Sequence, residues 1–365
     1  MRLRTCLAVE LCAGLTLLGG LGVGAVYGVR AGAGYLADTE AAAATIEAPE
    51  LAAAREGVRP LAGAQLHIDT LAPKLGTVFP KADEDLLAPL RGSKVVRVKL
   101  NHGGTSLSLR LDFEDGARCA FKPEQTFFQS NPRKEIAAYR IDRLLGIGHV
   151  APAVARSFSV DELVAAVDPS QRGAGTQKML DDIVARGGRV SGECQWWIPE
   201  IIDAKIEGER VDMDEGIVRW HRYLRAGAPI PDDALEMTAQ ISDVILFDFV
   251  IDNVDRWTLS NTKGTPDGHV LYFMDNTLSL TPYPTGLPKS HIYLHRSEKF
   301  SRRLVARLRT LTRDEVEKAL VDHGPLGALL QPDEVTALLA RRDAALAYID
   351  GLIADHGEDQ VLVFP

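Results

Sequence analysis

Residues 118–146 have the sequence RCAFKPEQTFFQSNPRKEIAAYRIDRLLG, and this stretch decides the fold. It holds a short apolar run that ends at Lys122 and, after a polar loop, a segment with apolar residues at helical spacing. Pro132 suits the first turn of a helix, and Gly146 suits its end. We therefore predict a strand over residues 118–121 and a helix over residues 133–145, with Glu135 near the start of that helix.

Two predicted strands precede this stretch. Residues 94–100 and 107–111 both alternate apolar and polar positions, as half-buried strands do. Gly-bearing turns separate the strands, and three strands joined in this way form an antiparallel meander. Gly103 and Gly104 lie in the first turn, where backbone N–H groups can approach phosphates. Any tight hairpin turn can carry such a pair, so the two glycines alone do not indicate a nucleotide site.

The rest of the chain changes from strands to helices. Residues 151–160 and 191–198 predict two more strands, and an insertion between them carries one amphipathic helix near residues 177–186. After residue 200 we predict a mainly helical part. Its helical segments are expected over residues 214–224, 232–249 and 297–356, its polar loop over residues 252–263, and its two strands over residues 269–274 and 361–364.

The composition narrows the class of protein. The chain has 365 residues, 46% of them hydrophobic, which is enough for two domains or for one large two-lobed domain. Its formal net charge of −9 disfavours nucleic acid as a partner, because a phosphate backbone attracts clustered Lys and Arg. Cys119 and Cys194 each lie in an apolar, strand-like run. They either pair outside the cytosol or stay buried as free thiols, and the sequence leaves both open.

The N-terminus has the composition of a membrane segment. Arg2 and Arg4 precede an uncharged run over residues 11–29, and Arg30 closes it. A basic start followed by an apolar run is typical of an export signal, and this run is long enough to span a bilayer. Residues 1–30 are therefore predicted as a signal peptide cut after residues 31–33 or as a retained single-pass anchor. Either alternative places the folded part outside the cytosol, membrane-anchored or secreted/periplasmic, after a stalk and extension over residues 31–90.

The candidate functional residues follow a particular order along the chain. A Lys ends the third strand (Lys122), a Glu lies in the next helix (Glu135), and an Asp-bearing loop comes much later. Transfer of a phosphoryl group needs a Lys at the nucleotide phosphates, a Glu that holds this Lys, and an Asp for the acceptor hydroxyl. Each residue taken alone also has an ordinary explanation, as a solvated strand-end lysine or as a first-turn glutamate favoured by the helix dipole.

The loop of residues 252–261, DNVDRWTLSN, is more specific. It follows an apolar helix and precedes a strand that ends in Asp275. Asp255 and Asn261 are the predicted catalytic base and a metal ligand, and Asp275 is placed to bind a divalent metal through its carboxylate. An Asx-rich surface turn is the structural alternative for this loop.

At this point the sequence resembles a known family, the four-jointed and Golgi casein kinase group of secretory-pathway kinases. The resemblance covers about residues 95–363 and is carried by short motifs in family order: FKP (121–123), EIAAYRIDRLLG (135–146), DNVDR (252–256), FMDN (273–276) and DQVLV (359–363). It implies an α+β, bilobal protein-kinase-like fold with an antiparallel-sheet N-lobe over residues 91–199 and a mainly helical C-lobe over residues 200–365.

The resemblance also implies the chemistry. ATP and a divalent metal, Mn²⁺ or Mg²⁺, are the expected cofactors. Lys122 contacts the nucleotide phosphates, Glu135 pairs with Lys122, Asp255 is the catalytic base and Asp275 is a metal ligand. Members of the group phosphorylate Ser or Thr of secreted proteins or a sugar hydroxyl of glycans, so the expected partner is a protein or glycan with a hydroxyl acceptor.

The chain departs from the group at three places. Trp257 follows Asp255 and Arg256 where the casein kinase branch has two histidines, and Asn261 lies one residue further from Asp255 than in related loops. The cysteine-rich disulfide pattern of the group is missing. These departures leave the acceptor open. They also leave two alternatives to an active protein or glycan kinase: a pseudokinase that binds nucleotide or regulates a partner, and a lipid or small-molecule kinase on the same fold.

Overall fold

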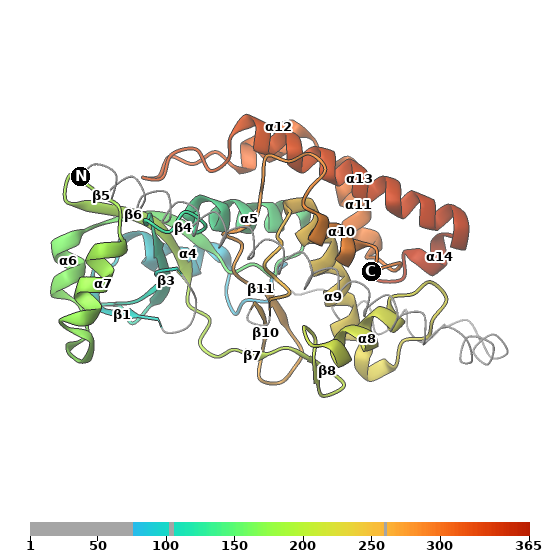
Figure 1. Cartoon of the computed structure of the whole chain (residues 1–365), viewed down its shortest axis with the longest axis horizontal. Coiled ribbons are helices and arrows are strands. Elements are labelled where there is room, and N and C mark those ends of the chain that lie inside the picture. The colour runs from blue at the N-terminus through green and yellow to red at the C-terminus, as the bar shows by residue number, and fades with distance from the viewer. Residues whose placement is uncertain (1–75, 102–105, 259–260) are drawn as a thin grey trace, which may run out of the picture. The chain divides into compact units, whose positions relative to one another are not determined.

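The computed structural model describes residues 76–101, 106–258 and 261–365, which all belong to one compact unit, Gly63–Pro365 (Figure 1). The predicted membrane segment, the part of the stalk and extension before residue 76, and the Gly103–Gly104 turn lie outside the described residues, so these expectations stay predictions. Within the described ranges, no helix combines the length and apolar character needed to cross a bilayer.

An antiparallel sheet forms the first part of the fold, as predicted. Its strands lie in the order β1-β2-β3-β6-β4, with β5 paired to β6. Leu109 and Phe121 are cross-strand partners on the buried face, whereas Arg110 and Ala120 pair on the opposite face, which also carries Lys122. The bounds are β1 Val95–Leu100, β2 Leu109–Phe113, β3 Arg118–Pro123, β4 Ala153–Ser159, β5 Ala185–Arg186 and β6 Arg189–Trp196.

Helix α5 (Pro132–Leu145) forms where the sequence predicts it. The Asn131 side chain accepts a hydrogen bond from the backbone N–H of Arg133, which caps the first turn. The helix ends at Gly146, whose φ of 72° is a conformation that glycine adopts at little cost. It packs against β4 and β6, so Glu135 in its first turn faces the sheet and not solvent.

The two ends of the sheet hold elements that differ from the prediction. The helix expected near residues 177–186 is α7 (Ala174–Asp182), which starts earlier, and residues 185–186 form β5 instead. Gly187 and Gly188, with φ of 57° and 70°, turn the chain back so that β5 pairs with β6. Helix α4 (Asp83–Gly92), which packs against β4 and β6, was not predicted, and neither were α6 (Val160–Ala165) and η1 (Pro169–Gln171).

The second part of the described chain is mainly helical, as expected. Helix α9 is apolar over most of its length, and α10 and α13 pack against it. In Figure 1, α9 and α10 lie between α8 and the red C-terminal helices. The helices are α8 Asp214–Tyr223, α9 Asp232–Ile251, α10 Pro288–Leu294, α11 Arg302–Thr310, α12 Arg313–Ala319, α13 Pro332–His356 and α14 Glu358–Val361.

The remaining differences between the predicted and the observed elements concern the short strands of this second part. A three-stranded sheet has the order β11-β10-β7, and β8 pairs with β9. The predicted strand near residues 269–274 is β11, but the predicted loop over 252–263 ends earlier because β10 starts at Thr262. The last strand predicted over 361–364 is wrong, since α14 runs through Val361 and Phe364 makes a single bridge to Ser301. The bounds are β7 Ile202–Asp203, β8 Lys205–Ile206, β9 Glu209–Arg210, β10 Thr262–Gly264 and β11 Leu271–Phe273.

A disulfide joins Cys119 on β3 to Cys194 on β6. This decides between the two alternatives that the sequence left open for these cysteines. The bond lies on the buried face of the sheet and crosslinks the strand that carries Lys122 to its neighbour.

Candidate active site

Lys122 lies at the centre of a cluster of carboxylates. Its Nζ is 2.7 Å from Oδ1 of Asp275 and 3.8 Å from Oε2 of Glu135. Glu193 is its cross-strand partner on β6. Burial lowers the pKa of Lys122, but the charges of Asp275 and Glu135 outweigh burial and raise this pKa well above its usual value. The ammonium group therefore stays charged at any physiological pH.

Glu135 is fully buried and its carboxylate is held from two sides. The backbone N–H and the side-chain amide of Asn276 donate to it at 2.6 and 3.1 Å, and Gln195 on β6 donates to Oε1 at 3.1 Å. Such bonds to a carboxylate offset much of the desolvation of a buried charge. The structure thus places Lys122 and Glu135 within ion-pair distance of each other, and Asn276 binds Glu135 beside them.

Asp275 lies two residues after the end of β11 and has a φ of 56°, which is uncommon for a residue other than glycine. Its Oδ1 also accepts a hydrogen bond from Thr277 Oγ1 at 2.9 Å. Burial raises the pKa of Asp275, but the charge and hydrogen bond of Lys122 outweigh burial and hold this pKa below its usual value. With 37% of its side chain exposed, Asp275 presents a charged carboxylate to the site.

Asp255 is positioned by its own loop. The side-chain oxygen of Asn253 accepts a hydrogen bond from the Asp255 N–H, and Thr258 Oγ1 donates to Asp255 Oδ1 at 3.2 Å. Asn261 donates its amide to Oδ2 of Asp255 at 2.9 Å. Because Thr262 pairs with Phe273, Asn261 and Asp275 lie at the same end of the β10–β11 hairpin. The structure therefore brings Asp255, Asn261 and Asp275 to one place.

A buried polar network connects this loop to the Lys122 cluster. Arg256 is fully buried and donates to both carboxylate oxygens of Asp248, at 3.1 Å each. It also donates to Asn276 Oδ1 at 2.8 Å, and Asn276 in turn binds Glu135. Burial raises the pKa of Asp248 to about 6, although Arg256 opposes this shift. A continuous chain of hydrogen bonds thus runs from α9 through the loop to α5.

Glu193 is a site residue that the sequence analysis missed. It is fully buried, and neither carboxylate oxygen has a hydrogen-bond partner in the part of the chain that the structure describes. Burial raises the pKa of Glu193 well above its usual value, and the charge of Lys122 only partly offsets this. The only signal in the sequence is a lone Glu inside an otherwise apolar strand. Asn276 was also missed as a functional residue, although it lies in a family motif.

The donor set suits a divalent metal bound together with a polyphosphate. Asp275 supplies a carboxylate and Asn261 an amide, and oxygen ligands are the type that Mg²⁺ and Mn²⁺ prefer. Over the described ranges, no group of three or more His, Cys, Asp or Glu side chains can hold a metal by itself. A metal at Asp275 therefore requires further oxygens, which phosphate groups provide in kinases.

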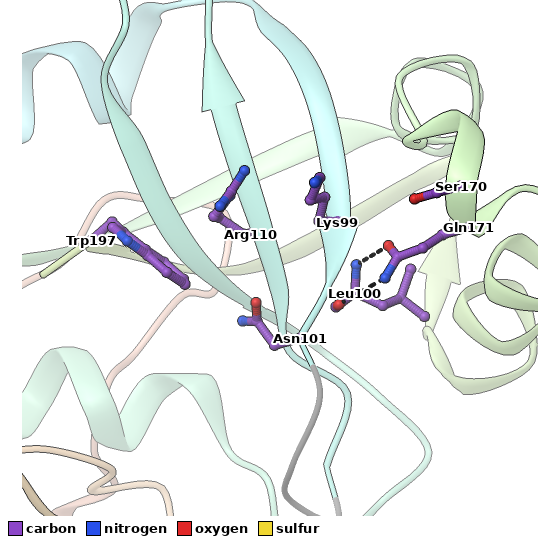
Figure 2. A pocket seen from close by; sticks show the side chains of 7 residues that line it. All are labelled: Lys99, Leu100, Asn101, Arg110, Ser170, Gln171 and Trp197. Atoms are coloured by element: carbon purple, nitrogen blue, oxygen red, sulfur yellow. Dashed lines mark hydrogen bonds between the residues drawn. The ribbon is translucent and has the colours of Figure 1, made fainter. Parts of the chain in front are cut away.

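A cavity of about 290 Å³ opens beside strands β1 and β2 (Figure 2). Arg110 is opposite Ala120 in the sheet register, and Lys122 is two residues further along β3, so the cavity and Lys122 share one face of the sheet. Trp197 lies just after β6, and its backbone N–H donates a hydrogen bond to the carbonyl of Arg118. The cavity is lined by Lys99, Leu100, Asn101, Arg110, Ser170, Gln171 and Trp197.

The fold and the site together define a kinase-like protein. Solved structures confirm this class for the fold. The chain is similar to the Golgi casein kinase, with a TM-score of 0.58 and 15% identity over 79% of this chain and 80% of that one. It is also similar to hydra Fam20 solved with a sugar, with a TM-score of 0.60 and 16% identity over 82% of this chain and 97% of that one. The same Golgi casein kinase has been solved with Mn and ADP bound, with a TM-score of 0.59.

Curated relatives fall in the same group. The human glycosaminoglycan xylosylkinase is 22% identical over 78% of this chain and 80% of its own length. The human extracellular serine/threonine protein kinase FAM20C is 20% identical over 75% of this chain, which spans 53% of that protein. No model of a known protein family matches the chain.

These similarities confirm the resemblance to the Golgi casein kinase group that the motifs indicate. At the level of that group the curated relatives also support a kinase as the class of enzyme. The bound Mn and ADP are those of the solved Golgi casein kinase.

Proposed function

We propose that this chain transfers the γ-phosphate of ATP to a hydroxyl group of a substrate outside the cytosol, either a Ser or Thr of a protein or a sugar of a glycan. One observation carries the proposal. The residues that phosphoryl transfer requires come from separate elements and meet in one buried network, in which Asn276 joins the Lys122–Glu135 pair to the loop of Asp255.

Lys122 and Asp275 form the part of the site that binds the nucleotide. The permanently charged Lys122 binds the α- and β-phosphates, and Glu135 holds it in place. Asp275 and Asn261 would hold the divalent metal. When bound, such a metal would neutralise charge on the phosphate oxygens and stabilise the departing ADP. Since Lys122 lies within ion-pair distance of both Glu135 and Asp275, it keeps a carboxylate partner while Asp275 serves the metal.

Asp255 forms the part of the site that meets the acceptor. Asn261 and Thr258 fix the orientation of its carboxylate, which lies at a half-buried position on the loop. A carboxylate placed in this way accepts a hydrogen bond from the acceptor hydroxyl, orients its oxygen for in-line attack and takes up its proton.

The cavity beside Trp197 supplies room for the base and ribose. It lies on the face of the sheet that carries Lys122, so a nucleotide can extend from it toward the Lys122 cluster. Trp197 offers an aromatic ring at its edge, and Arg110 lies 5.7 Å from that ring. Gly103 and Gly104, predicted to approach the phosphates, come shortly after Asn101 in the sequence, and Asn101 lines the cavity.

The two kinds of acceptor rest on the relatives. One curated relative is named a glycosaminoglycan xylosylkinase and another a serine/threonine protein kinase, so both a sugar and a protein hydroxyl are supported. Trp257, in place of the histidines of the casein kinase branch, separates this chain from that branch at the loop nearest the acceptor.

An extracytoplasmic location is part of the proposal. The Cys119–Cys194 disulfide supports it, because structural disulfides persist in oxidising compartments. The uncharged run over residues 11–29 supports it as well. A reporter that is active only in the cytosol, fused after Pro365, should be silent, and an active reporter would contradict this location.

The proposed function is tested by incubating the purified chain with labelled ATP, Mn²⁺ or Mg²⁺, and a mixture of peptides and glycans. We expect metal-dependent transfer to at least one acceptor. Nucleotide binding without transfer to any acceptor, to water or to the chain itself would favour the pseudokinase alternative. Transfer to lipids or small metabolites alone would favour the alternative of a lipid or small-molecule kinase.

A further inference from the structure

Lys289, on α10, is unusual among the half-buried and buried lysines of the described chain. Every other lysine of this kind donates to a carboxylate or a carbonyl: Lys99, Lys122, Lys134, Lys263 and Lys299. Among the described residues, no hydrogen-bond acceptor or carboxylate lies within bonding distance of the Lys289 ammonium. A half-buried ammonium without such a partner is costly unless a ligand compensates it.

The surroundings of α10 place Lys289 over the loop of Asp255. Oδ1 of Asp252 accepts hydrogen bonds from the Leu287 N–H at 2.8 Å and from Ser290 Oγ at 3.1 Å. Asp252 is fully buried and ends α9 three residues before Asp255. The start of α10 is therefore fixed to the start of the loop on both sides of Lys289.

A second contact fixes the other end of the same helix face. The rings of Trp257 and Tyr293 stack with centroids 4.8 Å apart and an interplanar angle of 16°. Lys289 and Tyr293 are four residues apart in α10, so their side chains lie on one face of the helix. That face is packed against the loop two residues after Asp255.

The electrostatics agree with this placement. Burial lowers the pKa of Lys289, and the charge of Asp255 is the one that opposes this shift. The proposed site also gathers negative charge, from Asp255, Asp275 and a triphosphate. Its other cation, Lys122, is already bound to Asp275 and Glu135.

We propose that Lys289 binds the γ-phosphoryl group of ATP and stabilises its oxygens during transfer to the acceptor. This inference rests on the proposed function and deepens it. The bond from the γ-phosphorus to the β,γ-bridging oxygen breaks, that oxygen stays on ADP, and the acceptor oxygen bonds to the phosphorus. Asp255 takes the acceptor proton. Lys289 gains and loses no proton, and its charge offsets that of the transferred group.

The test compares a nonhydrolysable β,γ-imido analogue of ATP with ADP. Calorimetry in Mn²⁺ gives the affinity of each for wild type, Lys289→Met, Lys289→Arg and Lys318→Met, an exposed control on α12. Lys289→Met should lose about ten- to hundredfold in affinity for the analogue, the usual range for a bond between charged groups, with unchanged affinity for ADP. Lys289→Arg should recover part of this loss, and Lys318→Met should match wild type.

This design separates the two proposals. If wild type binds both nucleotides but transfers no phosphate, the proposed function fails, and the ratio of the two affinities still tests Lys289. An unchanged ratio in a folded Lys289→Met protein would overturn the role of Lys289, whether or not wild type transfers phosphate. If wild type binds neither nucleotide, both proposals are contradicted.

Discussion

The Lys122 cluster and the Asp255 loop stabilise their functional groups in opposite ways. Around Lys122, ionisable groups from the sheet, α5 and the end of β11 gather, and burial and neighbouring charges shift the pKa values of Lys122, Glu193 and Asp275. Around Asp255, hydrogen bonds within the loop position a half-buried carboxylate. Helix α10 is held against this loop by a contact with Asp252, which is distant from it in sequence. The comparison suggests that the first region sets where the nucleotide lies, whereas the second leaves room for an acceptor.

The largest effect on stability that we expect comes from the ion pair that connects the two regions. Arg256 and Asp248 are both buried, and Arg256→Met leaves the carboxylate of Asp248 without its cation. Breaking a buried pair in this way typically costs about 3–5 kcal/mol. The free energy of unfolding from urea titrations should fall by this amount. Arg313→Met, which removes an exposed pair with Glu317, should change it by less than about 1 kcal/mol. Equal effects of the two variants would show that the connection is not a structural one.

A smaller effect concerns the pH dependence of stability. Because burial raises the pKa of Glu193, the folded chain favours its neutral form. This contribution is complete below the unfolded pKa of 4.5 and is lost as the pH rises through the folded pKa. Between about pH 5 and pH 8, wild type should therefore lose stability relative to Glu193→Gln, by roughly 1–3 kcal/mol.

Urea titrations at several pH values measure this difference. Glu317→Gln, at an exposed position, serves as the matched control and should follow wild type across the range. A difference between wild type and Glu193→Gln that stays constant with pH would mean that Glu193 is ionised in the folded chain.

The sequence predicts those parts of the site whose signals are local. The caps of α5, Asn131 before it and Gly146 after it, define the helix that carries Glu135. The short apolar run before Lys122 is visible in the sequence, and so is the apolar run that ends in Asp275. Glu135, Lys122 and Asp275 thus lie on elements whose ends are determined by residues close to them in the sequence.

The parts that the sequence did not predict depend on distant contacts. Strands β7, β8 and β9 have two residues each, too few to show a periodic pattern. Glu193 becomes a site residue only because β6 pairs with β3 opposite Lys122. Helix α10, which carries Lys289, lies against the loop only because Asp252 and Trp257 hold it in place. Neither the pairing of Glu193 with Lys122 nor the packing of α10 on the loop can be recognised from the neighbouring residues in the sequence.

The most direct test of this account measures ATP affinity and phosphate transfer side by side for Asp275→Asn and Asp255→Asn. Asp275→Asn removes a charge from the proposed metal site, so Mn²⁺-dependent binding of ATP should weaken. Asp255→Asn should bind ATP as wild type does, while transfer falls by about 10²- to 10⁴-fold, the usual range for the loss of a general base. Undiminished transfer by Asp255→Asn, or unchanged metal-dependent binding by Asp275→Asn, would contradict the division of roles between the two regions.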